Sequence, residues 1–133
     1  MAERVYCLYR GKDQESILMQ KNACHDFAEK KGWNIVGEEQ EIGVSGYKAC
    51  ADDRVKLQRI RKAVEQGEFD ILLVFMYDQL GRNLNETPFI AEWFTKKGIH
   101  VWSVYEGEII DGVDAERMLD YIRFWQTDEA QKL

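Results

Sequence analysis

The chain has 133 residues, 45% of them apolar and 32% charged, and its net charge is −6. A single proline and the lack of a Ser/Gly-rich tract give no sign of disorder or of a linker, and no apolar run approaches the ~20 residues that span a bilayer. No secretory signal precedes the first apolar run, so we expect a cytoplasmic protein without membrane contact. The acidic net charge predicts that the domain alone binds DNA weakly.

Strands and helices alternate from the N-terminus onward. Residues 5–9 predict a first strand, and the period of the apolar residues predicts a helix over 14–31. The inner face of that helix is expected to comprise Ile17, Cys24, Phe27 and Ala28. Gly32 ends the helix, residues 33–36 predict a second strand, and a polar loop is centred on 43–46.

The middle of the chain continues this alternation. Asp52 and Asp53 are N-cap candidates for a helix that ends at Gly67. Its expected inner face comprises Leu57, Ile60, Ala63 and Val64. Residues 69–77 contain the most apolar run, which is typical of a central parallel strand covered on both faces.

The last third predicts two helices and a strand. A helix over 86–97 ends at Gly98. Its expected inner face comprises Phe89, Ile90, Trp93 and Phe94. Residues 99–105 predict a fourth strand, and a final helix is expected from about residue 114 to the end.

The alternation predicts an α/β domain over residues 1–133, with three layers and a mainly parallel sheet of four to five strands. Active sites in such folds lie at the carboxyl ends of the strands. Chemistry is therefore expected at residues 10–14, 41–54 and 78–82, and from Glu106 onward.

The three cysteines are scattered and share no metal-ligand spacing with either histidine. This pattern predicts neither a metal site nor a disulfide framework. Two cysteines are expected as small buried side chains and one as a loop residue. No cofactor motif is present, and no cofactor is expected.

Several short segments share an order and spacing. Residues 6–14 read Tyr-Cys-Leu-Tyr-Arg-Gly-Lys-Asp-Gln, and a Ser-Ile-x-x-Gln helix start follows at 16–20. A Gly-Val-Ser-Gly loop at 43–46 precedes Arg-Val-Lys-Leu-Gln at 54–58. Asp-Gln-Leu-Gly-Arg-Asn stands at 78–83, and a Glu-Gly pair follows the fourth strand.

Together these segments resemble the N-terminal catalytic-type domain of serine site-specific recombinases of the resolvase/invertase family, closest to the large serine recombinase branch. The resemblance implies a resolvase-like fold with a long C-terminal helix, and DNA cleavage and rejoining by a serine hydroxyl that attacks a backbone phosphate. Such phosphoryl transfer needs a nucleophile and a cluster of fixed cations.

The family's nucleophile falls on Arg10 of this chain, whose guanidinium is no nucleophile because it stays protonated. Two of the family's arginines fall on Leu8 and Gln79, so these positions are degenerate. The resemblance therefore implies an impaired catalytic site.

Three site positions keep the family's residue types, namely Arg54, Asp78 and Arg82. We hypothesise that Arg10, Arg54 and Arg82 converge on a DNA phosphate that is bound without being cleaved. Asp78 either orients Arg82 or caps the turn after its strand. Glu41 stands where the family often has an aspartate.

Two serines are alternative nucleophiles with ordinary structural explanations. Ser16 lies in the first turns of a helix, where serine commonly satisfies backbone groups. Ser45 lies in the Gly-Val-Ser-Gly loop and is expected as a turn residue.

The final helix is apolar around much of its circumference and needs a partner surface. Its apolar residues are Met118, Leu119, Ile122 and Trp125. The resemblance implies that this helix joins two protomers and leads to DNA-binding domains. We therefore expect a piece of a longer protein whose DNA affinity lies mainly outside this chain. The expected partners are DNA and a second copy of the chain or an active recombinase.

Three functions follow as hypotheses. The first is an impaired catalytic-type domain in DNA recombination, and the second is a non-catalytic pseudo-recombinase that binds DNA or pairs with an active relative. The third is a response-regulator-like signalling domain with Asp78 as its acceptor. That domain needs acidic residues directly after strand one, where this chain has Arg10, Gly11 and Lys12.

Overall fold

A computed structural model describes residues 3–42, 55–80 and 86–109 of the chain. The strands within these residues are β1 (Arg4–Gly11), β2 (Asn34–Ile42), β3 (Ile71–Val74), β4 (His100–Ser103) and β5 (Gly107–Ile109). The helices are α1 (Gln14–Lys31), α2 (Val55–Glu65) and α3 (Glu86–Lys96), and η2 (Tyr77–Gln79) is a 3₁₀ turn.

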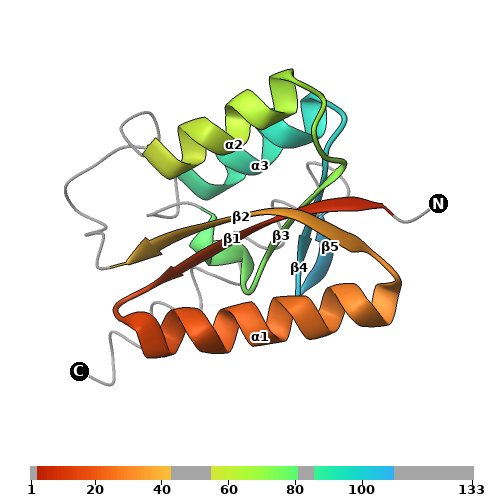
Figure 1. Cartoon of the computed structure of the whole chain (residues 1–133). Coiled ribbons are helices and arrows are strands. Elements are labelled where there is room, and N and C mark those ends of the chain that lie inside the picture. The colour runs from red at the N-terminus through yellow and green to blue at the C-terminus, as the bar shows by residue number, and fades with distance from the viewer. Residues whose placement is uncertain (1–2, 43–54, 81–85, 110–133) are drawn as a thin grey trace.

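The strands form one sheet in the order β2-β1-β3-β4-β5, in which only β5 is antiparallel to its neighbour. Helix α1 covers one face of the sheet, and α2 and α3 cover the other (Figure 1). The predicted three-layer α/β fold with a mainly parallel sheet is confirmed. The predicted final helix lies outside the described residues.

Helix α1 has the bounds that the sequence predicts, because both of its ends carry strong signals. The Asp13 carboxylate accepts a hydrogen bond from the Ser16 amide at 2.9 Å, which caps the amino end. Gly32 ends the helix in the left-handed conformation, with φ of 74°, and its amide donates to the Ala28 and Glu29 carbonyls.

Strand β2 is longer than predicted and lies at the edge of the sheet. It runs to Ile42, whereas the sequence predicts a strand only as far as residue 36. Residues 37–41 are Gly-Glu-Glu-Gln-Glu, which have low strand propensity, so the prediction stops early. The parallel ladder to β1, which continues to the Gly11–Ile42 pair, holds this polar half of the strand in place.

Two apolar cores flank the sheet. Val5, Cys7 and Tyr9 of β1 face α1, while Leu8 joins the core beneath α2 and α3. Cys7 and Cys24 are buried free thiols, as predicted, and Cys50 lies outside the described residues. A hydrogen bond with Cys7, together with burial, raises the pKa of the Cys24 thiol, which makes it a poor nucleophile.

One predicted core residue is wrong. Phe89 of α3 is 72% exposed, although the sequence places it inward. The buried stripe of this helix comprises Thr87, Ile90, Ala91 and Phe94. That i, i+3, i+4, i+7 spacing leaves Phe89 on the outer face. The error arose because the small residues Thr87 and Ala91 were overlooked in favour of larger apolar side chains.

Strand β3 is completely buried over its four residues, as expected of a central strand. The chain then turns into η2, so that Tyr77 begins a turn instead of ending the strand. The predicted fourth strand, residues 99–105, is observed as the shorter β4, and the antiparallel β5 follows the predicted range and pairs back onto β4. None of the described helices is both long and apolar enough to cross a membrane.

Candidate functional site

The carboxyl end of β1 lies beside η2, at the side of the sheet where α1 and α2 begin (Figure 1). Strands β1 and β3 pair in parallel, with Leu8 opposite Val74, so their carboxyl ends leave the sheet together. On the other side of β1, Arg10 lies opposite Glu41 of β2. Because β1 and β3 end side by side, residue 10 lies close to the residues that follow β3.

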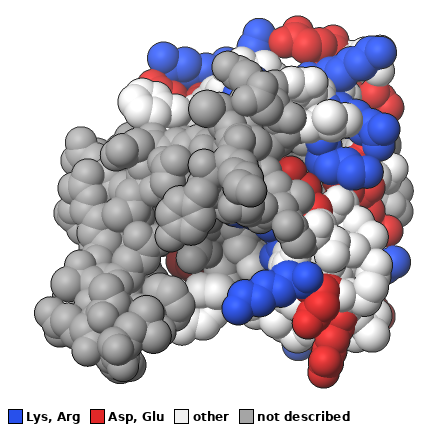
Figure 2. Space-filling view, turned by 90° about the vertical axis from the view of Figure 1, so that its left-hand side faces the viewer, with Lys and Arg blue, Asp and Glu red and all other residues white. Residues whose placement is uncertain are grey.

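Figure 2 views the molecule from this side. Basic and acidic side chains are intermingled on its described surface and form no single basic patch. For example, Lys56 and Arg59 of α2 both lie within ion-pair distance of Glu39, at 3.4 and 3.9 Å. Among the described residues on this side, acidic side chains therefore offset the basic ones.

The backbone of Arg10 is held by a buried glutamine from α1. The Gln20 Oε1 atom accepts a hydrogen bond from the Arg10 amide at 3.0 Å, and Gln20 Nε2 donates to the Arg10 carbonyl at 2.7 Å. Gln20 is only 1% exposed, and its side-chain amide pairs with Arg10 as a neighbouring strand would. The end of β1 is therefore fixed from the α1 side.

Replacing Gln20 with alanine is expected to destabilise the domain by about 2 kcal/mol, because the Arg10 amide loses its acceptor and the Arg10 carbonyl loses the shorter of its hydrogen bonds. The free energy of unfolding from urea titration measures this change. Gln14→Ala is the matched control, since Gln14 is an exposed residue of the same helix. Equal stability of the two variants would contradict a structural role for the Gln20 side chain.

A second glutamine reaches the same carbonyl from η2. Gln79 Nε2 donates to the Arg10 carbonyl at 3.4 Å, and Gln79 Oε1 accepts from the Met76 amide at 3.3 Å. Both ends of this half-buried side chain therefore contact backbone. Gln79 links the turn after β3 to the end of β1.

Leu8 occupies a purely apolar environment two residues before Arg10. It is completely buried, in a core cluster that includes Leu57, Ile60 and Leu80. Side chains alternate along a strand, so Arg10 projects toward the same α2 side as Leu8, while Tyr9 faces α1. Residue 8 therefore contributes packing, not charge, to this end of the sheet.

The sequence matches the family described as "Resolvase, N terminal domain" over residues 10–129. The chain belongs to this family of serine recombinases. Its function lies in site-specific DNA recombination, and the response-regulator hypothesis is set aside. A search of curated proteins returned no match.

Solved structures with the same fold include two recombinase domains of similar sequence. The N-terminal catalytic domain of TP901-1 integrase is 25% identical, with a TM-score of 0.74, over 95% of this chain and 98% of that one. The C-terminal catalytic domain of ISC1926 TnpA, an IS607-like serine recombinase, is 26% identical with a TM-score of 0.67. That match covers 77% of this chain and 70% of the other.

A resolvase family site-specific recombinase from Streptococcus pneumoniae is 19% identical, with a TM-score of 0.73. The match covers 98% of this chain and 92% of the recombinase chain. At this identity the likeness supports the resolvase fold alone.

Several residues predicted for the site of this resolvase domain lie outside what the structure describes. They are Arg54, Arg82, the side chain of Asp78, Ser45, and the apolar residues Met118, Leu119, Ile122 and Trp125. Leu8, Arg10 and Gln79 are described, and the hydrogen bond from the Gln79 side chain to the Arg10 carbonyl joins the last two. The convergence of the three arginines therefore stays a prediction.

Ser16 lies on the α1 side of the resolvase sheet, behind Gly11. A Cβ atom on Gly11 would come within 2.6 Å of Ser16 Oγ, so the serine packs directly against the strand backbone. Its Oγ also accepts from Gln20 Nε2 at 3.5 Å. Arg10 projects toward the opposite face, so the Ser16 hydroxyl does not share its surroundings.

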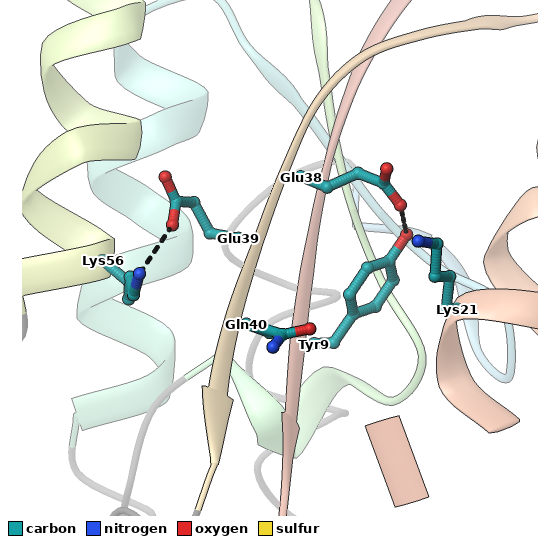
Figure 3. Close-up of a pocket in the computed structure, with 6 residues that line it drawn as sticks. All are labelled: Tyr9, Lys21, Glu38, Glu39, Gln40 and Lys56. Atoms are coloured by element: carbon teal, nitrogen blue, oxygen red, sulfur yellow. Dashed lines mark hydrogen bonds and ion pairs between the residues drawn. The ribbon is translucent and has the colours of Figure 1, made fainter. Parts of the chain in front are cut away.

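A shallow cavity of about 220 Å³ lies along the edge strand of this resolvase domain (Figure 3). Its lining residues are Tyr9, Lys21, Glu38, Glu39, Gln40 and Lys56. Glu38 accepts a hydrogen bond from the Tyr9 hydroxyl at 2.6 Å and lies 2.7 Å from His25 Nε2. Glu39 of the lining forms an ion pair with Lys56 at 3.4 Å. Among the described residues no cluster suits a metal ion.

The Glu38 network is expected to make the resolvase domain less stable in acid. Burial raises the pKa of Glu38, but hydrogen bonds from His25 and Tyr9 outweigh it and leave the pKa below its ordinary 4.5. The stabilisation is therefore present above pH 4.5 and is lost as pH falls below that value. Urea midpoints measured between neutral pH and about pH 3 should fall more steeply for the natural chain than for Glu38→Gln. Parallel curves would contradict this prediction.

Sequence reasoning treated Gln20 as a family landmark and gave it no role. The signal was nonetheless present, because Gln20 falls on the buried stripe of α1 with Ile17, Cys24 and Ala28. A polar side chain on an apolar stripe must find a buried partner. Here that partner is the backbone of Arg10.

Proposed function

We propose that this serine recombinase domain binds a DNA backbone phosphate without cleaving it, and acts in recombination as a binding or assembly subunit. The observation that supports this proposal is Arg10 at the end of β1, a position that the resemblance assigns to the family's nucleophile. Arginine keeps its proton at neutral pH and has no lone pair for attack on phosphorus. Its planar guanidinium instead binds phosphate oxygens in pairs.

The fixed backbone of Arg10 supports this binding role. Gln20 and Gln79 hold its amide and carbonyl from two sides, so little backbone entropy is lost when a phosphate binds. Glu41 lies opposite Arg10 in the strand register, so an anion needs further positive charge. Arg54 and Arg82 are proposed to supply it.

The proposed partner is DNA together with another recombinase subunit. A domain with a net charge of −6 gains little from non-specific phosphate contacts. Additional DNA affinity then comes from a partner or from a region outside this chain. The apolar residues Met118, Leu119, Ile122 and Trp125 are proposed to form the contact between subunits, with a second copy or with an active recombinase.

Inorganic phosphate titrated into the full chain tests the binding role directly. The side-chain Nε–H resonance of Arg10 is expected to shift on binding, and Arg10→Ala should weaken affinity about tenfold. Arg59→Ala is the matched control, because Arg59 is a surface arginine of α2 whose carboxylate neighbour is Glu39. Equal affinity of the natural chain and Arg10→Ala would contradict the proposal.

A further inference from the structure

Glu106 lies in the tight turn between β4 and β5, and its carboxylate accepts hydrogen bonds from the Tyr77 amide and the Ser103 hydroxyl. Its Oε2 atom accepts a hydrogen bond from the Tyr77 amide at 3.0 Å, across 29 residues of sequence. The same oxygen accepts a hydrogen bond from the Ser103 hydroxyl. The carboxylate therefore ties the β4–β5 turn to the first residue of η2.

Ser103 is committed to this arrangement. It is completely buried at the end of β4, and its hydroxyl oxygen also accepts from the Glu106 amide at 2.9 Å. The hydroxyl thus closes the turn around Glu106 while it orients the carboxylate. Gly107 follows with φ of 92°, a conformation that side chains rarely adopt.

The η2 turn needs an acceptor from elsewhere in the chain. Met76, which precedes the turn, has no side-chain oxygen for the Tyr77 amide, and Glu106 supplies one. The Tyr77 ring is buried, and burial together with the charge of Glu106 raises its pKa to about 12. Its hydroxyl has no hydrogen-bond partner among the described residues. The hydrogen bond from the Tyr77 amide to Glu106 is therefore the polar contact that holds this residue in place.

We propose that Glu106 is a positioning residue for the phosphate site. By fixing the Tyr77 amide, it sets the place of η2, and η2 places Gln79 against the Arg10 carbonyl. The backbone of Asp78 lies between those two anchored residues. The effect of Glu106 on phosphate binding rests on the proposed function, whereas its hold on η2 and Gln79 is independent of that function.

The identity of the accepting atom makes a sharp test possible. Both hydrogen bonds go to the same oxygen, so a glutamine with its Oε1 in that place keeps both of them. Glu106→Gln should therefore behave as the natural chain, and Glu106→Ala should not. Glu108→Ala is the matched control, because Glu108 is a nearby acidic residue whose carboxylate lies 2.9 Å from His100 instead.

Three readouts on the full chain decide the proposal. In Glu106→Ala, hydrogen exchange of the Tyr77 amide should accelerate about tenfold or more relative to the β3 amides. The side-chain amide resonances of Gln79 should shift, while those of Gln20 stay in place. The affinity for inorganic phosphate should fall several-fold, and Glu106→Gln should restore all three.

Unchanged Tyr77 exchange and Gln79 resonances in Glu106→Ala would overturn the proposal, as would failure of Glu106→Gln to restore them. If Glu106→Ala does not fold, Ser103→Ala takes its place, because it removes the hydroxyl that orients the carboxylate. It should shift both readouts in the same direction, and unchanged readouts overturn the proposal. If the natural chain binds no phosphate, the proposed function fails, while exchange and the Gln79 resonances still decide the role of Glu106.

Discussion

Leu8→Arg is expected to lower the free energy of unfolding by about 3 kcal/mol, a large part of the roughly 5–15 kcal/mol of a typical domain. Leu8 is completely buried among apolar side chains, so a guanidinium there loses its hydration. The acidic residue opposite it in the strand register is Glu39, which already lies beside Lys56 and Arg59. Urea unfolding followed by tryptophan fluorescence measures the loss.

Leu8→Met is the control, because a swap of similar volume should cost less than about 1.5 kcal/mol. Comparable stability of the arginine and methionine variants would mean that residue 8 opens toward solvent at the site. A large difference has a practical consequence. An arginine introduced at this position, where the resemblance places one, would then require changes in the surrounding core, so it could not be combined freely with other substitutions.

The natural protein is expected to form no covalent link to DNA. The test uses the full-length protein and DNA that carries its native element ends, and looks for protein-linked DNA on a denaturing gel. Loss of an enzyme's nucleophile lowers rates by a factor on the order of 10⁶, so adduct formation should be undetectable. An adduct with the natural protein would reveal a nucleophile at another position of the chain and would contradict the proposed function.

The double change Arg10→Ser and Gln79→Arg is the informative companion, with Leu8 left in place. Residue 79 is half-buried, so an arginine there can extend toward solvent at moderate cost. We expect this variant to form a detectable adduct, because it restores a hydroxyl at the position that the resemblance assigns to the nucleophile, where Arg54 and Arg82 are proposed to bind the phosphate. The single change Arg10→Ser controls for the added charge and should give less adduct than the double change.

The elements that sequence predicts best are those with local signals. Helix α1 carries a cap at Asp13 and a stop at Gly32, and β3 consists only of apolar residues, so both are evident without tertiary information. The polar half of β2 is different, since a ladder to β1 holds it in an extended conformation. The local sequence around Glu38 and Glu39 does not predict this pairing with β1.

The candidate site shows the same contrast between features with a local sequence signal and contacts between residues far apart in the sequence. The placing of Arg10 at the end of a strand follows from the alternation of elements. The contacts of Gln20, Gln79 and Glu106 with distant backbone do not, because they join residues up to 69 positions apart. The resemblance to the family places an arginine at position 8, which suggests that a positive charge has been lost there. The packing instead shows Leu8 as an apolar residue in an apolar core.

The acidic residues of β2 bear on how the protein behaves at high concentration. Among the described residues β2 pairs only with β1, so its outer row of amides and carbonyls is a template on which another extended chain can add. Two copies that met there edge to edge would bring Glu38 and Glu39 of each strand toward those of the other. Repulsion between like charges opposes the contact at neutral pH and weakens in acid, where Glu38 is protonated. Stocks of this protein should therefore stay clear near neutrality and aggregate first on acidification.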